Sequence, residues 1–167
     1  MSWNKRKAML AMLYISAKQD WRIDLYQLMK TIFWADKLHL QKWGELITDD
    51  VYKQSKYGPV PFNAYKLVVN LPRDNCAIDL RDLVTDHGRD SLTIEKIKYE
   101  LAQSEIDALD MAYEIFQGQD FNNIERIVHE TEYPPNQIIS LEVLAEGDEE
   151  LISYMRSQDE YKMALGQ

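Results

Sequence analysis

The sequence predicts a mainly helical α+β domain with a small antiparallel sheet inserted after the second helix. Most of the chain carries apolar residues at three- and four-residue spacing, which is the period of an amphipathic helix. Residues 47–61 instead carry short extended runs, a glycine and two prolines, which are typical of strands and turns. The 167 residues, 46% of them hydrophobic, suit one domain with a core of its own.

The first two helices are expected at residues 3–18 and 25–43. Asp24 and Gln27 form a pattern like a capping box, which places the start of the second helix. Gly44 is suited to a left-handed C-cap and places its end. The buried face of this helix is marked by apolar residues at helical spacing, namely Leu25, Leu28, Met29, Ile32, Phe33, Leu40 and Trp43.

Residues 47–57 are expected to form a β-hairpin that turns at Asp49–Asp50. The segment Gly-Pro-Val-Pro follows at residues 58–61. Because proline has no N–H and a fixed φ, this segment cannot be a central strand. We expect a rigid, extended connector from the hairpin into a short helix over residues 62–70. A turn between two more short strands is expected within residues 76–97.

Further helices are expected to begin at Ser104, Asp120, Ser140 and Asp148, because these residue types favour the N-cap position. Gly118 is expected to end the first of them and the Pro-Pro pair at 134–135 the second. We expect residues 1–167 to form a single domain. The sequence leaves open whether the terminal helix, at about residues 148–165, belongs to the core or is peripheral.

Charge and cysteine content narrow the function. The chain has 28 acidic and 19 basic residues and a net charge of −9, which argues against direct nucleic-acid binding and suits a basic protein partner. The single cysteine, Cys76, excludes an internal disulfide framework and favours the cytoplasm. No metal-binding motif, Walker loop or dinucleotide fingerprint occurs, so we expect no metal and no cofactor. No segment reaches membrane-spanning length.

Asp36 is the most informative charged residue, because its spacing from Ile32, Phe33 and Leu40 places it on the apolar face of the second helix. A buried carboxylate must be hydrogen-bonded or paired, or it becomes protonated. It could act as a general acid or base, or it could anchor a recognition loop. Alternatively it is a structural carboxylate that accepts hydrogen bonds from a bend rich in glycine and proline.

Two histidines extend the enzymatic alternative. His39 follows Asp36 by three residues, so the two could pair in acid–base chemistry, or His39 could be a packed histidine bonded to a neighbour. His129 lies in a helical stretch and is expected to be partly buried.

The segment around Gly58 is the predicted partner-binding site. A rigid corner loses little further conformational entropy on binding, and aromatic residues are enriched in protein interfaces. The residues predicted to bind a partner are Lys56, Tyr57, Gly58, Pro59, Val60, Pro61, Phe62 and Tyr65. The alternative is a stiff corner whose aromatic side chains belong to the core.

Residues 25–68 resemble the signature region of the Panacea, or SocA-like, antitoxin domain family. The positions that match the family pattern, in order and spacing, are Ala35, Asp36, His39, Gly44, Ile47, Thr48, Tyr52, Lys56, Gly58, Pro59, Val60 and Pro61. A weaker match follows at His129–Glu130, where Val128 replaces the hydroxyl residue of the family and the expected downstream tryptophan is absent.

The resemblance implies an antitoxin of a type II-like, often phage-associated pair, which binds and neutralises a cognate protein toxin encoded by the adjacent gene. It also implies that Asp36, His39, Tyr52 and His129 are structural or motif residues, with Asp36 organising the corner together with Tyr52 or backbone N–H groups. One branch of the family resembles a proteolytic adaptor that delivers its toxin to a Clp-type protease. We favour direct neutralisation. The adaptor, and an acid–base enzyme using Asp36 and His39, remain the alternatives.

Overall fold

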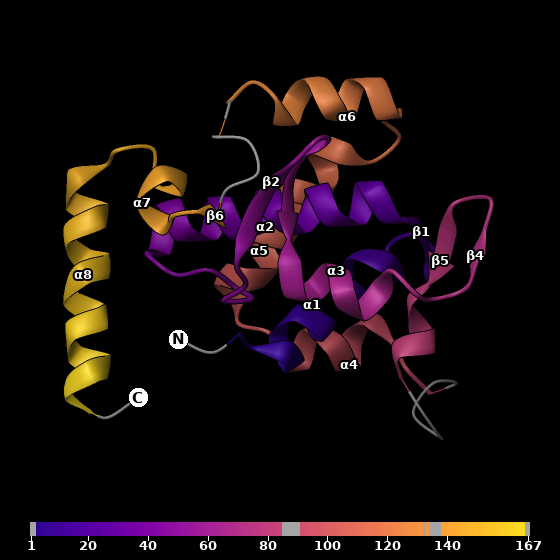
Figure 1. Cartoon of the computed structure of the whole chain (residues 1–167). Helices are drawn as coiled ribbons and strands as arrows, with labels where there is room; N and C mark the ends of the chain where they lie inside the picture. The colour runs from indigo at the N-terminus through magenta and orange to yellow at the C-terminus, as the bar shows by residue number, and fades with distance from the viewer. Residues whose placement is uncertain (1–2, 85–90, 132, 134–137, 166–167) are drawn as a thin grey trace.

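A computed structural model describes residues 3–84, 91–131, 133 and 138–165 of the chain. Its centre is the long helix α2 (Leu25–Trp43), which runs through the middle of the molecule in Figure 1. Helix α5 (Gln103–Phe116) packs along it, and α1 (Lys5–Ala17) and α4 (Ile94–Tyr99) lie on the same side (Figure 1). The predicted class, a mainly helical α+β domain with a small antiparallel sheet, is confirmed.

Helix α2 has the bounds that its capping residues predict. The side chain of Asp24 accepts from the backbone N–H of Gln27 at 3.1 Å, and Gly44 closes the helix with φ 78°. The Gln27 side chain does not complete a capping box, because it donates to Gln19 at 2.7 Å instead. The first helix, α1, is slightly shorter than predicted and begins after Asn4, whose side chain accepts from the N–H of Lys7.

The first of two small antiparallel sheets in the described part of the chain contains a strand before α2 that the sequence did not predict. Its strand order is β1–β5–β4, formed by β1 (Arg22–Asp24), β4 (Arg73–Asp74) and β5 (Ala77–Asp79). Strands of two or three residues are too short to show a period of two in a sequence. The prediction of a second strand after residue 90 was wrong, because a 3-10 turn η1 (Leu80–Leu83) and helix α4 follow β5. Residues 85–90, where the predicted turn falls, lie outside the described residues.

The second sheet has the strand order β3–β2–β6, formed by β2 (Tyr52–Ser55), β3 (Gly58–Pro61) and β6 (Ile138–Ile139). The predicted hairpin turn at Asp49–Asp50 was wrong. The hairpin turns at Lys56–Tyr57, and the Gly-Pro-Val-Pro segment is itself its second strand. This strand lies at the edge of the sheet, where the missing proline N–H groups break no ladder.

Helix α3 (Phe62–Val68) leaves β3 directly. The remaining helices are α6 (Phe121–Val128), α7 (Leu141–Leu144) and α8 (Glu149–Ala164). Their predicted caps are confirmed, since the side chains of Asp120, Ser140 and Asp148 accept from backbone N–H groups three residues ahead. Helix α6 ends earlier than predicted, and residues 134–137, with the proline pair, lie outside the described residues.

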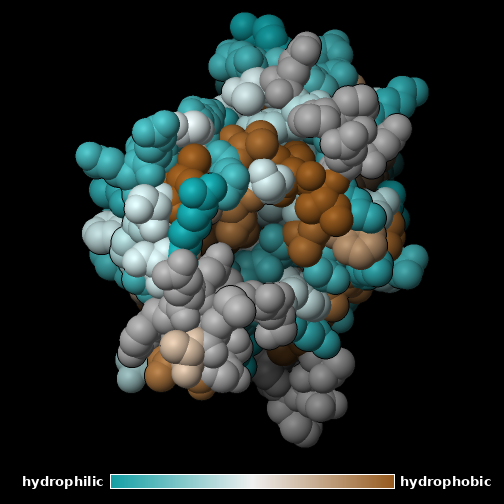
Figure 2. Space-filling model, turned by 60° about the vertical axis from the view of Figure 1, so that its left-hand side comes forward, coloured by the Kyte–Doolittle hydropathy of each residue, from teal (hydrophilic) through white to brown (hydrophobic). Residues whose placement is uncertain are grey.

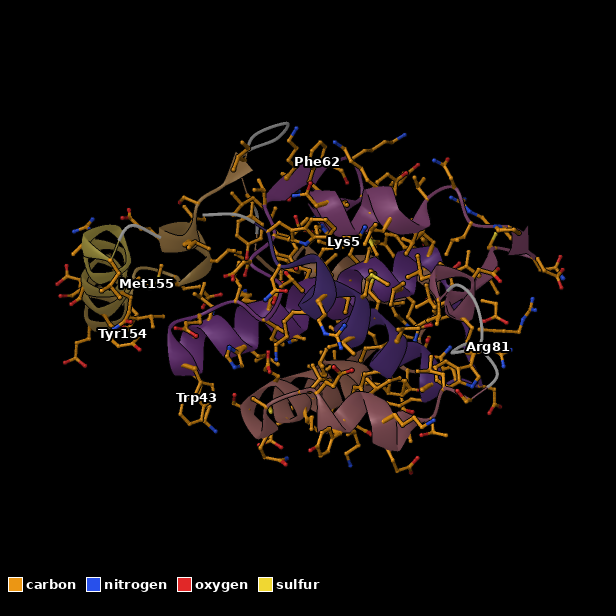
Figure 3. The ribbon with its side chains drawn as sticks, turned by 90° about the horizontal axis from the view of Figure 1, so that it is seen from below. Lys5, Trp43, Phe62, Arg81, Tyr154 and Met155 are labelled. Carbon is orange, nitrogen blue, oxygen red and sulfur yellow. The ribbon has the colours of Figure 1, made fainter. Side chains whose placement is uncertain are left out.

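Among the described residues, three hydrophobic clusters form the core, and two of them join most of these elements. The larger one joins α1, α2 and α5, and the smaller one surrounds Phe33, Tyr52 and Tyr133 beside α7. Helix α8 stands at the side of the body and packs on the smaller cluster through Met155 (Figures 1 and 3). Figure 2 brings this side forward and shows hydrophobic residues gathered in the middle of the face, bordered by hydrophilic ones. Within the described part of the chain, no helix is long and apolar enough to cross a membrane.

Candidate functional site

Asp36 is buried in α2 beneath the loop that leads into the β2–β3 hairpin, with 1% of its surface exposed. Its Oδ1 accepts from the backbone N–H groups of Ile47 at 2.7 Å and Thr48 at 3.1 Å. Its Oδ2 accepts from the Thr48 hydroxyl at 2.6 Å and the Tyr52 hydroxyl at 2.7 Å. The N–H groups of residues 47 and 48 are therefore satisfied by a side chain, which explains why no strand forms there.

The network continues from Thr48 to the start of helix α3. The Thr48 hydroxyl accepts from the N–H of Asp50, and the Asp50 carboxylate accepts from the N–H groups of Val51, Asn63 and Ala64 at 2.7–3.0 Å. Helix α3 has no cap from its own N-cap residue, Pro61. Asp50, eleven residues upstream of Pro61, thus satisfies the orphan donors of that helix.

Sequence reasoning missed this role of Asp50, because Asp49–Asp50 resembles a hairpin turn. A usable signal was present, since α3 begins after a proline and lacks a local serine, threonine or aspartate to cap it.

Burial sets the protonation of this network. Removal from water raises the pKa of Asp36 to about 6, and the four hydrogen bonds it accepts act in the opposite direction because they favour the ionised form. Burial and the neighbouring Asp36 raise the pKa of Tyr52 well above its ordinary value, so its hydroxyl stays a donor. The polar network fixes the hairpin at both ends, at Tyr52 in β2 and at the entry to α3.

The structure divides the eight predicted partner-binding residues into two groups. Gly58, Pro59 and Pro61 are buried and shape the hairpin from within. The other five carry exposed or half-exposed side chains, namely Lys56, Tyr57, Val60, Phe62 and Tyr65. Gly58 has φ 100°, and an added Cβ would lie 3.3 Å from Val128 and 3.4 Å from the Lys30 ammonium. A side chain is therefore excluded there by backbone conformation and by space.

Lys30, which sequence reasoning also missed, lies beneath this strand with only 1% of its surface exposed. Its ammonium donates to the carbonyl oxygen of Pro59 at 2.6 Å and lies 5.3 Å from the ring centre of Tyr26. Burial lowers the pKa of Lys30 to about 7. Its position three residues before Phe33, on the apolar side of α2, was the available signal.

A groove of about 570 Å³ runs beside the hairpin. It is lined by all five of the exposed or half-exposed predicted residues, together with residues from the start of α2 and from the β4–β5 hairpin. Its volume falls in the range of ligand-binding clefts. The groove and the exposed hairpin tip therefore form one continuous surface.

Three aromatic rings tie the hairpin tip to α6. Tyr26 lies 6.5 Å from Tyr57 and 4.6 Å from Phe121 between ring centres, and Tyr57 lies 5.7 Å from Phe121. Tyr57 and Phe121 are each 45% exposed. Such partly exposed, well-packed aromatic groups are common at the centres of protein interfaces.

His39 does not pair with Asp36. Its Nδ1 lies 2.5 Å from the carbonyl oxygen of Glu45, and its Nε2 lies 3.0 Å from the Ser104 hydroxyl. Both ring nitrogens are thus occupied by groups other than the carboxylate. His39 is therefore a packed histidine that is hydrogen-bonded to its neighbours.

His129 lies apart from both, as the residue that ends α6, with its Nε2 3.8 Å from Glu125. His39 lines a second, smaller cleft with Ser104, and neither Asp36 nor His129 lines that cleft or the groove beside the hairpin. Among the described residues, no group of three histidine, cysteine or acidic residues could bind a metal ion. The shared open cleft that acid–base catalysis by these three residues requires is not formed by them.

The chain was compared with known proteins. A family model described as antitoxin SocA-like, Panacea domain, matches residues 28–134. This range contains Asp36, the hairpin, the groove's central residues and α6. Neither the search of curated proteins nor the search of solved structures found a match.

Proposed function

Because the chain belongs to the family of SocA-like antitoxins with a Panacea domain, we propose that it binds a cognate protein toxin directly and thereby neutralises it. The toxin is encoded by the adjacent gene, and the pair acts in the cytoplasm as a type II-like system. The chain serves as a binding protein and not as an enzyme.

The single observation that carries this proposal is the anchoring of the β2–β3 hairpin. Buried Asp36 and Asp50 are bonded to both of its ends, while Tyr57 and Tyr65 remain 45% and 38% exposed. A surface that is already ordered loses little conformational entropy when a partner binds. A rigid backbone that presents partly exposed aromatic groups is suited to recognising another protein.

The arrangement of the polar residues favours binding over catalysis. Asp36 is enclosed by four donors and 1% exposed, so it has no route to a substrate. His39 has both ring nitrogens engaged. These groups stabilise the hairpin that a partner contacts.

The test is co-expression of the tagged chain with the product of the adjacent reading frame, scoring growth and the mass of the purified complex. We expect rescue of growth and a stoichiometric complex. Lys56→Ala with Tyr65→Ala should weaken both, with an unchanged melting temperature, because both side chains are exposed. The matched control is Tyr99→Ala on α4, since Tyr99 is 93% exposed and lies outside the groove.

Two other outcomes would contradict the proposal. Rescue that depends on a Clp-type protease, with toxin lost from the cell, would indicate a proteolytic adaptor. Rescue without any complex, abolished by His39→Ala at unchanged stability, would indicate an enzyme.

A further inference from the structure

The groove beside the hairpin has a charge opposite to that of the whole chain. The chain carries a net charge of −9. The charged residues that line the groove are Lys30, Lys53, Lys56, Arg73 and Asp24, four basic against one acidic. Asp24 is occupied as the N-cap of α2. A cleft lined mainly by positive charges attracts negatively charged ligands, even on a protein that is acidic as a whole.

The groove lysines differ from other lysines of the chain in their ion pairing. Lys7, Lys18 and Lys37 each contact a carboxylate at 2.6–2.8 Å. Within the described part of the chain, none of the three groove lysines is in an ion pair with a carboxylate. The charges of the two exposed groove lysines, Lys53 and Lys56, are therefore available to a ligand.

Aromatic rings hold the exposed lysines at the rim of the groove. The ammonium of Lys53 lies 4.2 Å from the ring centre of Phe62, and that of Lys56 lies 5.4 Å from the ring centre of Tyr57. Both lysines are exposed. Their aliphatic stems lie along apolar surface while the charged ends face water. Lys30 contributes from below through its field, since its ammonium is bonded to Pro59 and the side chain is 1% exposed.

The floor between these cations is apolar. It is formed by Leu25 and Met29 of α2 and by Val60 of β3. A ligand that fills the groove therefore combines an apolar side chain with negative charge.

The strand edge also restricts how a ligand binds. In β3, Pro59 and Pro61 have no N–H, and the Pro59 carbonyl already accepts from Lys30. An incoming strand would find no backbone donors at these two residues. Recognition must rest on side chains placed into the groove and not on extension of the sheet.

We propose that the groove receives an acidic segment of the protein partner, in which a large apolar side chain fills the floor and flanking carboxylates meet Lys53, Lys56 and Arg73. This inference rests on the proposed function, because the segment belongs to the toxin. A peptide segment is favoured over a nucleic acid because the net charge of −9 repels a polyphosphate chain beyond the groove. Locally, the partner surface is acidic, whatever the charge of the toxin as a whole.

The first experiment needs no toxin. The full ¹⁵N-labelled chain is titrated with the peptide amide N-acetyl-Glu-Phe-Glu-Leu-Glu and with analogues in which glutamine or lysine replaces each glutamate. We expect the acidic peptide to shift the amide resonances of residues 53–57, 60 and 62–65. It should also slow alkylation of Cys76, the only cysteine, which is exposed and lines the groove.

Charge variants give the matched control. Lys53→Gln with Lys56→Gln should weaken the acidic peptide at least about tenfold, the factor that corresponds to about 1.4 kcal/mol. Lys5→Gln with Lys98→Gln removes the same charge from exposed positions outside the groove and should change affinity less than about twofold. Equal binding of the lysine peptide, shifts confined to other surfaces, or a uridine oligonucleotide that displaces the acidic peptide would overturn the inference.

The same variants, tested on the toxin complex, separate this inference from the proposed function. A complex that forms and is unaffected by the Lys53/Lys56 change overturns the groove inference and leaves neutralisation intact. Growth rescue that fails with the wild-type chain, while the acidic peptide still binds the groove, overturns toxin neutralisation and leaves the groove's ligand class standing.

Discussion

Lys30 and Asp36, two of the charged residues buried on α2, lie six positions apart and differ in how their side chains are hydrogen-bonded. Asp36 accepts four hydrogen bonds, from two backbone N–H groups and two hydroxyls. Lys30 can donate three, and its one hydrogen bond in the described structure is to Pro59. Both are 1% exposed. The carboxylate is therefore fully hydrogen-bonded within the fold, whereas two of the three possible donors of Lys30 have no hydrogen-bond acceptor among the described residues.

This difference assigns a structural role to one end of the β2–β3 hairpin and a binding role to the other. The end near Asp36 is fixed by a network that reaches Tyr52 and Asp50. The strand over Lys30 borders a groove with Lys53 and Lys56 at its rim, and neither lysine is in an ion pair with another described residue. Changes at the first end should lower the free energy of unfolding, and changes at the second should alter binding and pH dependence more than stability.

The largest effect is expected for Asp36→Ala. This change leaves buried N–H and hydroxyl donors without an acceptor and should lower the free energy of unfolding by about 3–5 kcal/mol. Urea unfolding followed by circular dichroism measures it. Glu95→Gln, at an exposed position on α4, is the control and should stay within about 0.5 kcal/mol. A loss below about 1 kcal/mol for Asp36→Ala would contradict its structural role.

The next effect is expected for Asp50→Ala, which removes the distant cap of α3. The N–H groups of Asn63 and Ala64 lose their acceptor, and a loss of about 2 kcal/mol is expected, at the upper end for a helix cap. Hydrogen exchange should accelerate at Asn63 and Ala64 first. Asp120→Ala, which removes the cap of α6, is the comparison for an exposed position and should cost less. Equal protection in α3 before and after the change would contradict the cap.

The burial of Asp36 could be predicted from the sequence, whereas its hydrogen-bond partners could be predicted only in outline. Its spacing within an apolar helix face predicts burial, and Gly44 and Asp24 predict the bounds of that helix. The acceptance of hydrogen bonds from residues 47, 48 and 52 depends on how a loop returns over the helix. That path is set by tertiary packing, which local patterns do not encode.

Lys30 and the strand assignments show why other features were missed. A lysine in a helix is normally assigned to the solvated face, because its charge disfavours burial. Here the proline-containing edge strand supplies a carbonyl above it, and the two are brought together only by the fold. The same applies to Gly58–Pro61, where two prolines predict a connector, yet an edge strand accommodates them.

A smaller effect is expected for Tyr52→Phe, which removes one of the four donors to Asp36. The loss should be about 1 kcal/mol. Burial raises the pKa of Asp36 to about 6, so the folded state binds this proton more tightly than the unfolded state, and its contribution to stability falls as pH rises from about 4 to 6. Because the lost bond favours the ionised form, Tyr52→Phe should raise the pKa of Asp36 further. A carboxyl-carbon NMR titration measures it, and an unchanged or lower pKa would contradict this assignment.

The smallest effect on stability at pH 7 is expected for Lys30→Met, and its signature is the dependence on pH. Burial lowers the pKa of Lys30 to about 7, so between about pH 7 and 10 the unfolded chain binds a proton that the folded chain lacks. Lys30 therefore makes the wild-type chain more stable as pH rises through this range, by at most about 1.4 kcal/mol per pH unit.

Lys30→Met should lose that slope, while its stability at pH 7 changes little, because the gain from removing a buried charge offsets the loss of the hydrogen bond to Pro59. Tyr26 on α2 lies beside Lys30, and Lys53 and Lys56 on the hairpin line the same groove. A matched change of one of them, Lys56→Met, should leave the slope in place, because Lys56 is exposed. If Lys30→Met and the wild-type chain show the same slope between pH 7 and 10, Lys30 does not titrate in this range, and the lowered pKa attributed to its burial is contradicted.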